Sequence, residues 1–120
     1  MGIPVFDFSV KQGNSGTLEN PAGLVARLVQ ADQQPKDLTG AEIVFFASWN
    51  GENQLRLTST ANEVLVDATA GRVTVPFDVT IFRMVSSRAS VRYELELREG
   101  SMQRTVLEGR IKIVGGISDD

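Results

Sequence analysis

The sequence contains neither cysteine nor histidine. Without cysteine the chain forms no disulfide framework and no thiolate metal site, so packing and backbone pairing must hold the fold together. Without histidine it lacks the usual general base, the commonest zinc ligand and the side chain that titrates near neutral pH. These absences argue against most enzyme classes. We therefore expect no catalytic residues, no cofactor and no small-molecule substrate.

Long hydrophobic runs are also missing. No stretch approaches the roughly 20 apolar residues of a membrane-spanning helix, and no basic region followed by an apolar one opens the chain. We expect neither membrane insertion nor export by a standard signal. The 120 residues are 42% hydrophobic and 22% charged, a balance typical of one folded domain. The prediction is a single domain over residues 1–120, with 1–12 and 115–120 as candidate extended arms.

The clearest periodic pattern lies in residues 90–98, where apolar and charged side chains alternate. A period of two over this length predicts a half-buried strand with one wet face. After a break at 99–101, alternation resumes: the odd-numbered positions hold Thr105, Leu107, Ile111 and Ile113, and Gly109 interrupts this set. The two segments predict an antiparallel hairpin in which Gly109 marks a bulge or a close contact.

Shorter strands are predicted over 5–10, 24–30, 42–49, 54–58, 63–67 and 72–77. The segment 42–49 is apolar on both parities, as expected of a central strand or of one whose outer face meets a partner. One helical turn is predicted over 78–87. No amphipathic helix is long enough to cross over a parallel sheet. The pattern therefore predicts an all-β, immunoglobulin-like antiparallel sandwich of seven to eight strands with one short helical turn.

Two carboxylates invite a catalytic interpretation. Glu94 and Glu96 project from one strand face about 7 Å apart, a spacing that suits a pair acting on a glycosidic bond. Arg92 and Arg98 share that face, however, so a solvated ladder of alternating charge explains the pattern better. Acidic residues elsewhere lack the alternating spacing of a calcium loop, so we expect no metal site, and a structural calcium ion stays an open alternative.

Charge is divided unevenly along the chain. Residues 1–71 hold four basic and eight acidic side chains, residues 72–112 hold eight and five, and the tail adds two acidic ones. This division would suit head-to-tail contacts between copies, or pairing of the two regions within one sandwich, and the second interpretation is preferred. Because the balance is acidic and the arginines alternate with carboxylates, we expect no binding to nucleic acid.

Apolar residues exceed what one buried face per sheet requires. Either a partner covers the surplus, or a helix or loop of the same chain covers one outer face. We predict a contact surface from residues whose parity or loop position leaves them outside the core: Val44, Phe46, Phe82, Arg83 and Met84.

Four short motifs follow one another in the chain. They are Asp37-Leu38-Thr39-Gly40-Ala41 leading into segment 42–49, Ala70-Gly71-Arg72-Val73-Thr74-Val75, Tyr93-Glu94-Leu95-Glu96-Leu97, and Leu107-Glu108-Gly109-Arg110-Ile111-Lys112-Ile113. In this order and spacing they resemble small proteins from the structural regions of tailed phages, and specifically the N-terminal domain of phage baseplate upper proteins. The resemblance covers about residues 24–114.

The resemblance implies an immunoglobulin-like sandwich without catalysis or cofactor that docks to other virion proteins and to copies of itself. It implies a virion protein, assembled in the bacterial host cytoplasm, with a tail or baseplate adaptor preferred. The long extension of the upper baseplate proteins is absent after Asp120, so a capsid decoration or head-tail connector protein stays open. A carbohydrate-binding module for the host surface is the other alternative. Besides phenylalanine it would have only Trp49 and Tyr93 for stacking, and Tyr93 lies on the core parity.

Overall fold

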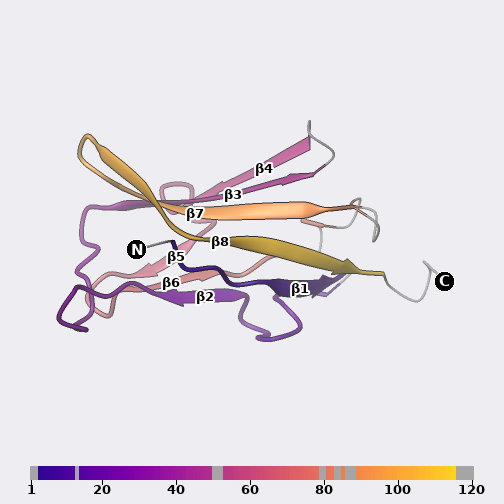
Figure 1. The fold of residues 1–120 in the computed structure, drawn as a ribbon, viewed down its shortest axis with the longest axis horizontal. Coiled ribbons are helices and arrows are strands. Elements are labelled where there is room, and N and C mark those ends of the chain that lie inside the picture. Colours follow the sequence, from indigo (N-terminus) through magenta and orange to yellow (C-terminus); the bar gives the residue numbers. More distant parts are fainter. Residues whose placement is uncertain are drawn as a thin grey trace.

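A computed structural model of the chain describes residues 3–12, 14–49, 53–78, 81–82, 85 and 89–115. All regular structure in these residues is β: β1 (Phe8–Lys11), β2 (Leu24–Arg27), β3 (Glu42–Trp49), β4 (Asn53–Thr58), β5 (Leu65–Asp67), β6 (Arg72–Val75), β7 (Val91–Glu99) and β8 (Met102–Val114). They form a five-stranded sheet in the order β1-β8-β7-β3-β4 and a three-stranded sheet in the order β2-β6-β5. Figure 1 shows the two sheets stacked in a β-sandwich-like arrangement.

The predicted hairpin is present. β7 and β8 pair in antiparallel fashion from Val91 opposite Ile111 to Glu99 opposite Met102. One irregularity interrupts the ladder: Leu95 lies opposite Leu107, but the next residue lies opposite Thr105. A β-bulge of this kind adds one residue to one strand, and here the extra residue belongs to β8. The alternation of faces along β8 is therefore shifted by one residue at the bulge. Leu107 lies opposite Leu95 on the core side, whereas Thr105 lies opposite Glu96 on the outer side. Their spacing of two residues in the sequence had predicted the same face for both.

Gly109 marks a close contact and not the bulge. A Cβ atom at this position would lie 2.2 Å from the carbonyl oxygen of Phe6, because the N-terminal segment runs directly beside it. The Phe6 N–H donates to the Glu108 carbonyl at 2.9 Å. One residue further on, the Asp7 carboxylate accepts a hydrogen bond from the Arg110 N–H, also at 2.9 Å. The absence of a side chain is thus what lets the two backbones pair here.

The same pairing continues into β1, which runs parallel to β8 from Phe8 opposite Ile111 to Lys11 opposite Val114. Residues 8–11 of the candidate N-terminal arm are therefore a strand of the five-stranded sheet, and Val5 forms an isolated bridge to Glu108. Of the second candidate arm, only Gly115 lies within the described residues.

Two further expectations concern strand positions. β3 lies between β7 and β4, which confirms that it is an interior strand. β6 lies in the middle of its sheet and ends at Val75, so Pro76 marks a strand end, where its missing N–H costs no ladder bond.

The short helical turn predicted over 78–87 is not seen. In the described part of this segment, the Ile81 N–H donates to the Asp78 carbonyl at 3.1 Å and the Val85 N–H donates to the Phe82 carbonyl at 3.2 Å. These are separate turns. The apolar side chains that suggested a helix instead cap the sandwich, since Phe82 and Val85 are 2% and 3% exposed.

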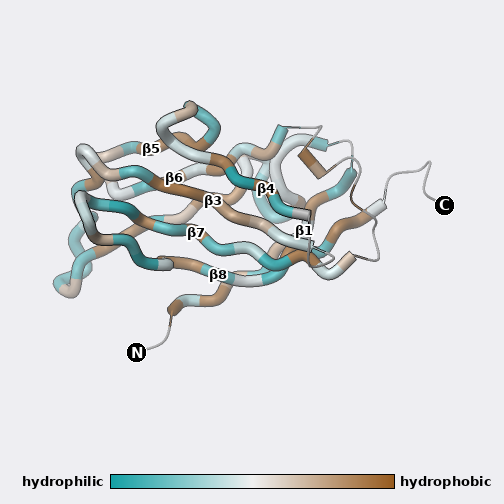
Figure 2. The backbone as a smooth tube through the Cα atoms, turned by 90° about the horizontal axis from the view of Figure 1, so that it is seen from above, coloured by the Kyte–Doolittle hydropathy of each residue, from teal (hydrophilic) through white to brown (hydrophobic). Residues whose placement is uncertain are grey.

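The core lies between the two sheets. Along β7 the apolar residues are all buried while Arg92 and Glu94 are exposed, as period two requires. Figure 2 shows the tube mostly hydrophobic along β3 and mostly hydrophilic along β7. At the centre, the Phe45 ring lies between those of Phe77 and Tyr93, with centroid distances of 5.2 and 5.6 Å. These three rings pack β3 and β7 of the larger sheet against the segment that follows β6 of the smaller sheet.

Candidate functional site

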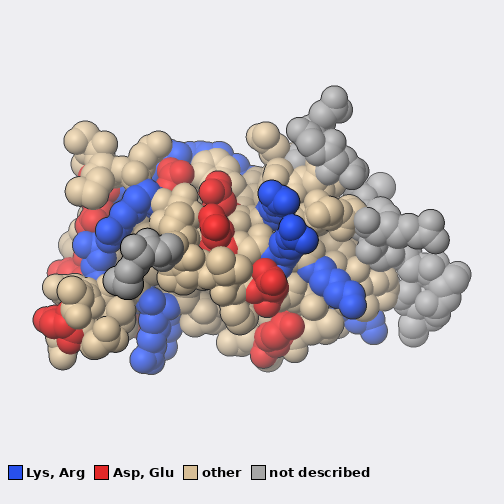
Figure 3. Space-filling model, viewed as in Figure 1, with Lys and Arg blue, Asp and Glu red and all other residues tan. Residues whose placement is uncertain are grey.

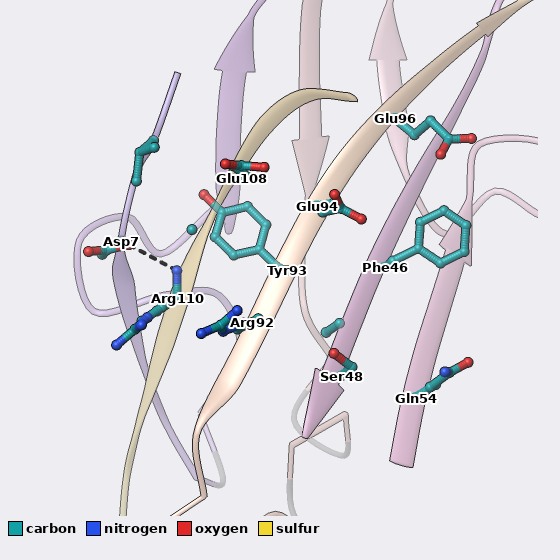
Figure 4. A pocket seen from close by; sticks show the side chains of 13 residues that line it. Asp7, Phe46, Ser48, Gln54, Arg92, Tyr93, Glu94, Glu96, Glu108 and Arg110 are labelled. Atoms are coloured by element: carbon teal, nitrogen blue, oxygen red, sulfur yellow. Dashed lines mark hydrogen bonds between the residues drawn. The ribbon is translucent and has the colours of Figure 1, made fainter. Parts of the chain in front are cut away.

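The outer face of the five-stranded sheet forms an open groove of about 820 Å³. Its lining residues come from the N-terminal segment and from β8, β7, β3 and β4, as Figure 4 shows. We call this surface the charged groove. Its labelled lining residues are Asp7, Phe46, Ser48, Gln54, Arg92, Tyr93, Glu94, Glu96, Glu108 and Arg110.

Strand register sorts these side chains into rows that cross the sheet. One row runs from Val5 through Glu108, Glu94 and Phe46 to Arg56. The next runs through Arg110, Arg92, Ser48 and Gln54. Neighbouring rows are two residues apart along each strand, which is about 7 Å. We call Glu94 with Glu108 the acidic row, and Arg92 with Arg110 the basic row.

Like charges therefore lie directly opposite each other twice: Glu94 faces Glu108 across the β7–β8 ladder, and Arg92 faces Arg110. Such pairs are unfavourable, because facing Cβ atoms are only about 5 Å apart. Among the residues that the structure describes, none of these four side chains forms an ion pair within 4.0 Å.

Three other charged residues on the same face are paired with one another. Arg98 binds Glu96 at 2.6 Å and reaches Glu42 at 3.8 Å. This pairing separates the two carboxylates considered above, since Glu96 is held by an arginine and Glu94 lies opposite Glu108. The arrangement is the ladder of mixed charge that the sequence predicted.

An apolar side chain interrupts the charges. Phe46 is partly exposed on β3, and the guanidinium carbon of Arg56 lies 5.8 Å from the centre of its ring. At this distance a cation–π contact holds the arginine over the ring face. Phe46 lines the charged groove, and Arg56 lies against its ring.

Tyr93 lies beneath the groove, with its ring in the core. The side chain is 2% exposed, and its ring centroid is 5.0 Å from that of Phe8. Its hydroxyl donates to the Phe6 carbonyl, which ties β7 to the N-terminal segment across β8. Burial raises the pKa of the Tyr93 hydroxyl, and the nearby Asp7 carboxylate raises the pKa further. The prediction that Tyr93 lies on the core parity is confirmed.

We expect stability to fall at alkaline pH because of Tyr93. The folded state raises the pKa of the Tyr93 hydroxyl above its ordinary value of 10.0. The contribution of the protonated hydroxyl to folding stability is therefore fully present below pH 10. It is lost as the pH rises further, because the unfolded chain releases this proton first. In that range the free energy of unfolding should fall by about 1.4 kcal/mol per pH unit. Tyr93 is the one tyrosine in the chain, so tyrosinate absorbance should appear together with unfolding. Tyr93→Phe should lose this additional alkaline decline; an unchanged decline in that variant would contradict the assignment.

The predicted contact residues have different positions. Phe82 is not outside the core: it is 2% exposed and packs against Phe77 at 5.4 Å. Val44 faces the outer side of β3 but is 0% exposed, since its neighbours in register, Glu96 and Thr58, are themselves mostly buried. Of the three described residues, Phe46 is the one that lines the charged groove. Arg83 and Met84 lie outside the described residues.

The other ring considered for stacking, Trp49, is only partly exposed and meets Phe82 edge-on at 6.4 Å. Neither Trp49 nor Tyr93 therefore forms an open aromatic platform.

The uneven charge along the sequence is partly balanced within the sandwich. Two of the four ion pairs among the described residues join a carboxylate of the acidic region 1–71 to an arginine of the basic region 72–112: Asp67 with Arg72 and Glu42 with Arg98. The pair between Lys36 and Glu99, at 3.2 Å, links the two regions with the opposite polarity. These contacts favour the interpretation in which the acidic and basic regions pair within one chain.

Sequence reasoning missed Glu108 and Arg110 as members of the site. The period of two placed both on a solvent-facing side of the strand, but nothing in the local sequence indicates which residue of β7 lies opposite each of them. That information lies in the register, which the bulge sets.

In the described part of the chain, no three acidic side chains gather to form a possible metal site. No helix found there is long and apolar enough to span a membrane. Comparison of the chain with protein-family models and with curated proteins found no match.

Proposed function

We propose that this chain is a non-enzymatic structural protein of a tailed-phage particle, a β-sandwich adaptor of the tail or baseplate that acts through protein–protein contacts. The resemblance of its four motifs to the N-terminal domain of baseplate upper proteins supports the phage assignment. The observation that carries the role in contacts is an exposed apolar segment, residues 3–6, at the edge of the five-stranded sheet.

This edge segment is apolar, exposed and fixed at once. Ile3, Val5 and Phe6 are 42%, 66% and 43% exposed. The segment is nevertheless anchored to β8, because the Glu108 N–H donates to the Pro4 carbonyl at 3.1 Å. Apolar side chains that are held in place and left in water favour a role in contact with another protein, where burial would remove them from water.

We further propose that the sandwich is immunoglobulin-like. In that topology the second, fourth and fifth strands of the core form one sheet and the third, sixth and seventh form the other. Here β2, β5 and β6 share one sheet and β3, β7 and β8 share the other, with β4 added beside β3 as in the variable-type domains. β1 departs from the constant-type arrangement, in which the first strand shares the sheet of the second, because it pairs in parallel with β8 and extends the larger sheet.

Quantitative mass spectrometry of purified particles from an induced or infected culture tests the proposal. We expect the chain in the particle at a small copy number relative to the major capsid protein, as a tail or baseplate position requires. A copy number comparable with that of the capsid protein would instead make it a decoration protein. Its absence from the particle would contradict the virion assignment.

A substitution in the edge segment tests the contact itself. Ile3→Glu should lower the copies per particle by about tenfold or more, because a charge would be buried without a partner in the assembled state. Leu65→Glu is the matched control, since Leu65 is 53% exposed on the other sheet. Equal incorporation of both variants would contradict a contact through residues 3–6.

A further inference from the structure

We propose that the charged groove is the contact surface between two copies of this chain, related by a two-fold axis that crosses the strands between the acidic and basic rows. This inference rests on the proposed function, for which it names a surface and a partner. The occupant is a second copy because the groove carries a charge pattern complementary to itself.

The starting observation is the pair of like-charged rows. Glu94 faces Glu108, Arg92 faces Arg110, and none of the four is neutralised by an ion pair among the described residues. On the same face, Glu96 is neutralised by Arg98 at 2.6 Å. The sheet thus satisfies one set of charges internally and leaves another arranged in rows. Figure 3 shows acidic and basic side chains alternating over the face formed by β7 and β8.

Two-fold symmetry places these rows against each other. In a face-to-face dimer with the axis perpendicular to the strands and midway between the rows, each acidic row lies over the basic row of the other copy. Glu94 then faces Arg92 of the second copy. Likewise, Glu108 faces Arg110 of the second copy. Each contact occurs twice by symmetry, so the eight charges of the acidic and basic rows of the two copies are matched.

The other face-to-face orientation is excluded by the same charges. An axis parallel to the strands, between β7 and β8, would set Glu94 against Glu108 of the second copy and Arg92 against Arg110. Such juxtaposition is strongly unfavourable when water is excluded. The pattern therefore selects one of the two arrangements.

The rest of the surface fits this arrangement. Phe46 lies two residues from Ser48 on β3, so the same axis sets the phenylalanine ring against a small neutral side chain of the second copy. The hollow of about 820 Å³ leaves room for the long arginine and glutamate side chains of both copies. In Figure 4 the four charged side chains stand out from one face of β7 and β8, with Phe46 beside them.

Charge reversal with sedimentation analysis tests the proposal on the full chain. We expect a wild-type dimer whose association weakens as salt rises, because salt screens such pairs. R92E/R110E and E94R/E108R should each associate at least about 100-fold more weakly, since every facing pair becomes like-charged. A mixture of these two variants should form a heterodimer, since an all-acidic face then meets an all-basic one.

Reversing all four charges is the decisive control. The variant E94R/E108R/R92E/R110E restores the self-complementary pattern, so it should dimerise with itself and not with the wild-type chain. R27E changes an exposed charge of β2, on the other sheet, and should leave association unchanged. Circular dichroism and thermal denaturation of each variant separate a loss of contact from a loss of fold.

Two results would overturn the inference: a wild-type chain that stays monomeric at all concentrations, or double variants that dimerise as the wild type does. Neither result bears on the particle assignment. A chain that is monomeric in solution but present in the particle would contradict the dimer and support the proposed adaptor role. A chain that dimerises but is absent from particles would support the dimer and contradict the virion assignment.

Discussion

Replacing Phe45 by alanine is expected to lower the free energy of unfolding by about 3–5 kcal/mol, measured by urea or thermal denaturation. The ring is 0% exposed and lies 5.2 Å from that of Phe77 and 5.6 Å from that of Tyr93. Its removal loses the burial of a large apolar side chain and leaves a cavity between the sheets. Because small domains are stable by only about 5–15 kcal/mol, a large part of the total stability would be lost.

Phe46→Ala is the matched control. This neighbouring phenylalanine points to the opposite face of β3, is partly exposed, and contacts Arg56 over its ring. Its removal should cost about 1 kcal/mol, since part of its surface already meets water and the cation–π contact adds little at an exposed site. Equal losses for the two variants would contradict the assignment of the two faces.

Gly109→Ala is expected to destabilise the chain by about 1–3 kcal/mol. The new Cβ would lie 2.2 Å from the Phe6 carbonyl oxygen and 2.8 Å from its carbonyl carbon. Both are backbone atoms that no change of rotamer can move, so the N-terminal segment must shift from β8. The hydrogen bonds that Tyr93 and Asp7 make across this contact should weaken, and amide exchange at Phe6 and Arg110 should become faster.

Two comparisons isolate the cause of that loss. Lys112→Ala, also in β8 but exposed, should change the free energy of unfolding by less than about 0.5 kcal/mol. In a chain that lacks residues 1–7, Gly109→Ala should cost little, because the atoms it meets are gone. A full penalty in the shortened chain would mean that the clash with Phe6 is not the reason.

The Gly109 contact also connects stability to the proposed role. It fixes the edge segment 3–6 beside the charged groove, since Tyr93 and the backbone of Glu108 both bind that segment. We therefore expect Gly109→Ala to lower incorporation into particles as Ile3→Glu does, but with a loss of stability that Ile3→Glu lacks.

The alternation of apolar and charged residues by itself determined which side chains of β7 face the core. Val91, Tyr93, Leu95 and Leu97 are all buried. The reason is local: successive side chains of a strand point to opposite faces, so the pattern fixes the buried face before any partner strand is known. The absence of an amphipathic helix likewise restricted the fold to β-sheets.

The conformation of segment 78–87 could not be predicted from its sequence and was decided by the tertiary structure. Apolar residues at Ile81, Phe82 and Val85 have the spacing of one helical turn, but the same spacing suits successive turns that cap a sandwich. In the described residues, the hydrogen bonds from the Ile81 N–H to Asp78 and from the Val85 N–H to Phe82 form separate turns, and the Phe82 ring packs against Phe77 and Trp49. This packing removes Phe82 from the surface.

The register of the hairpin was also decided by the tertiary structure. Counting back from the turn, Glu94 would lie opposite Leu107, but the bulge between Leu95 and Glu96 shifts it to Glu108. That one residue brings Gly109 opposite Tyr93 and aligns the acidic and basic rows. Period two sets the face of each side chain, but register is set by pairing between strands. The sequence therefore determined which charges lie on the wet face, and only the folded sheet decided which of them meet.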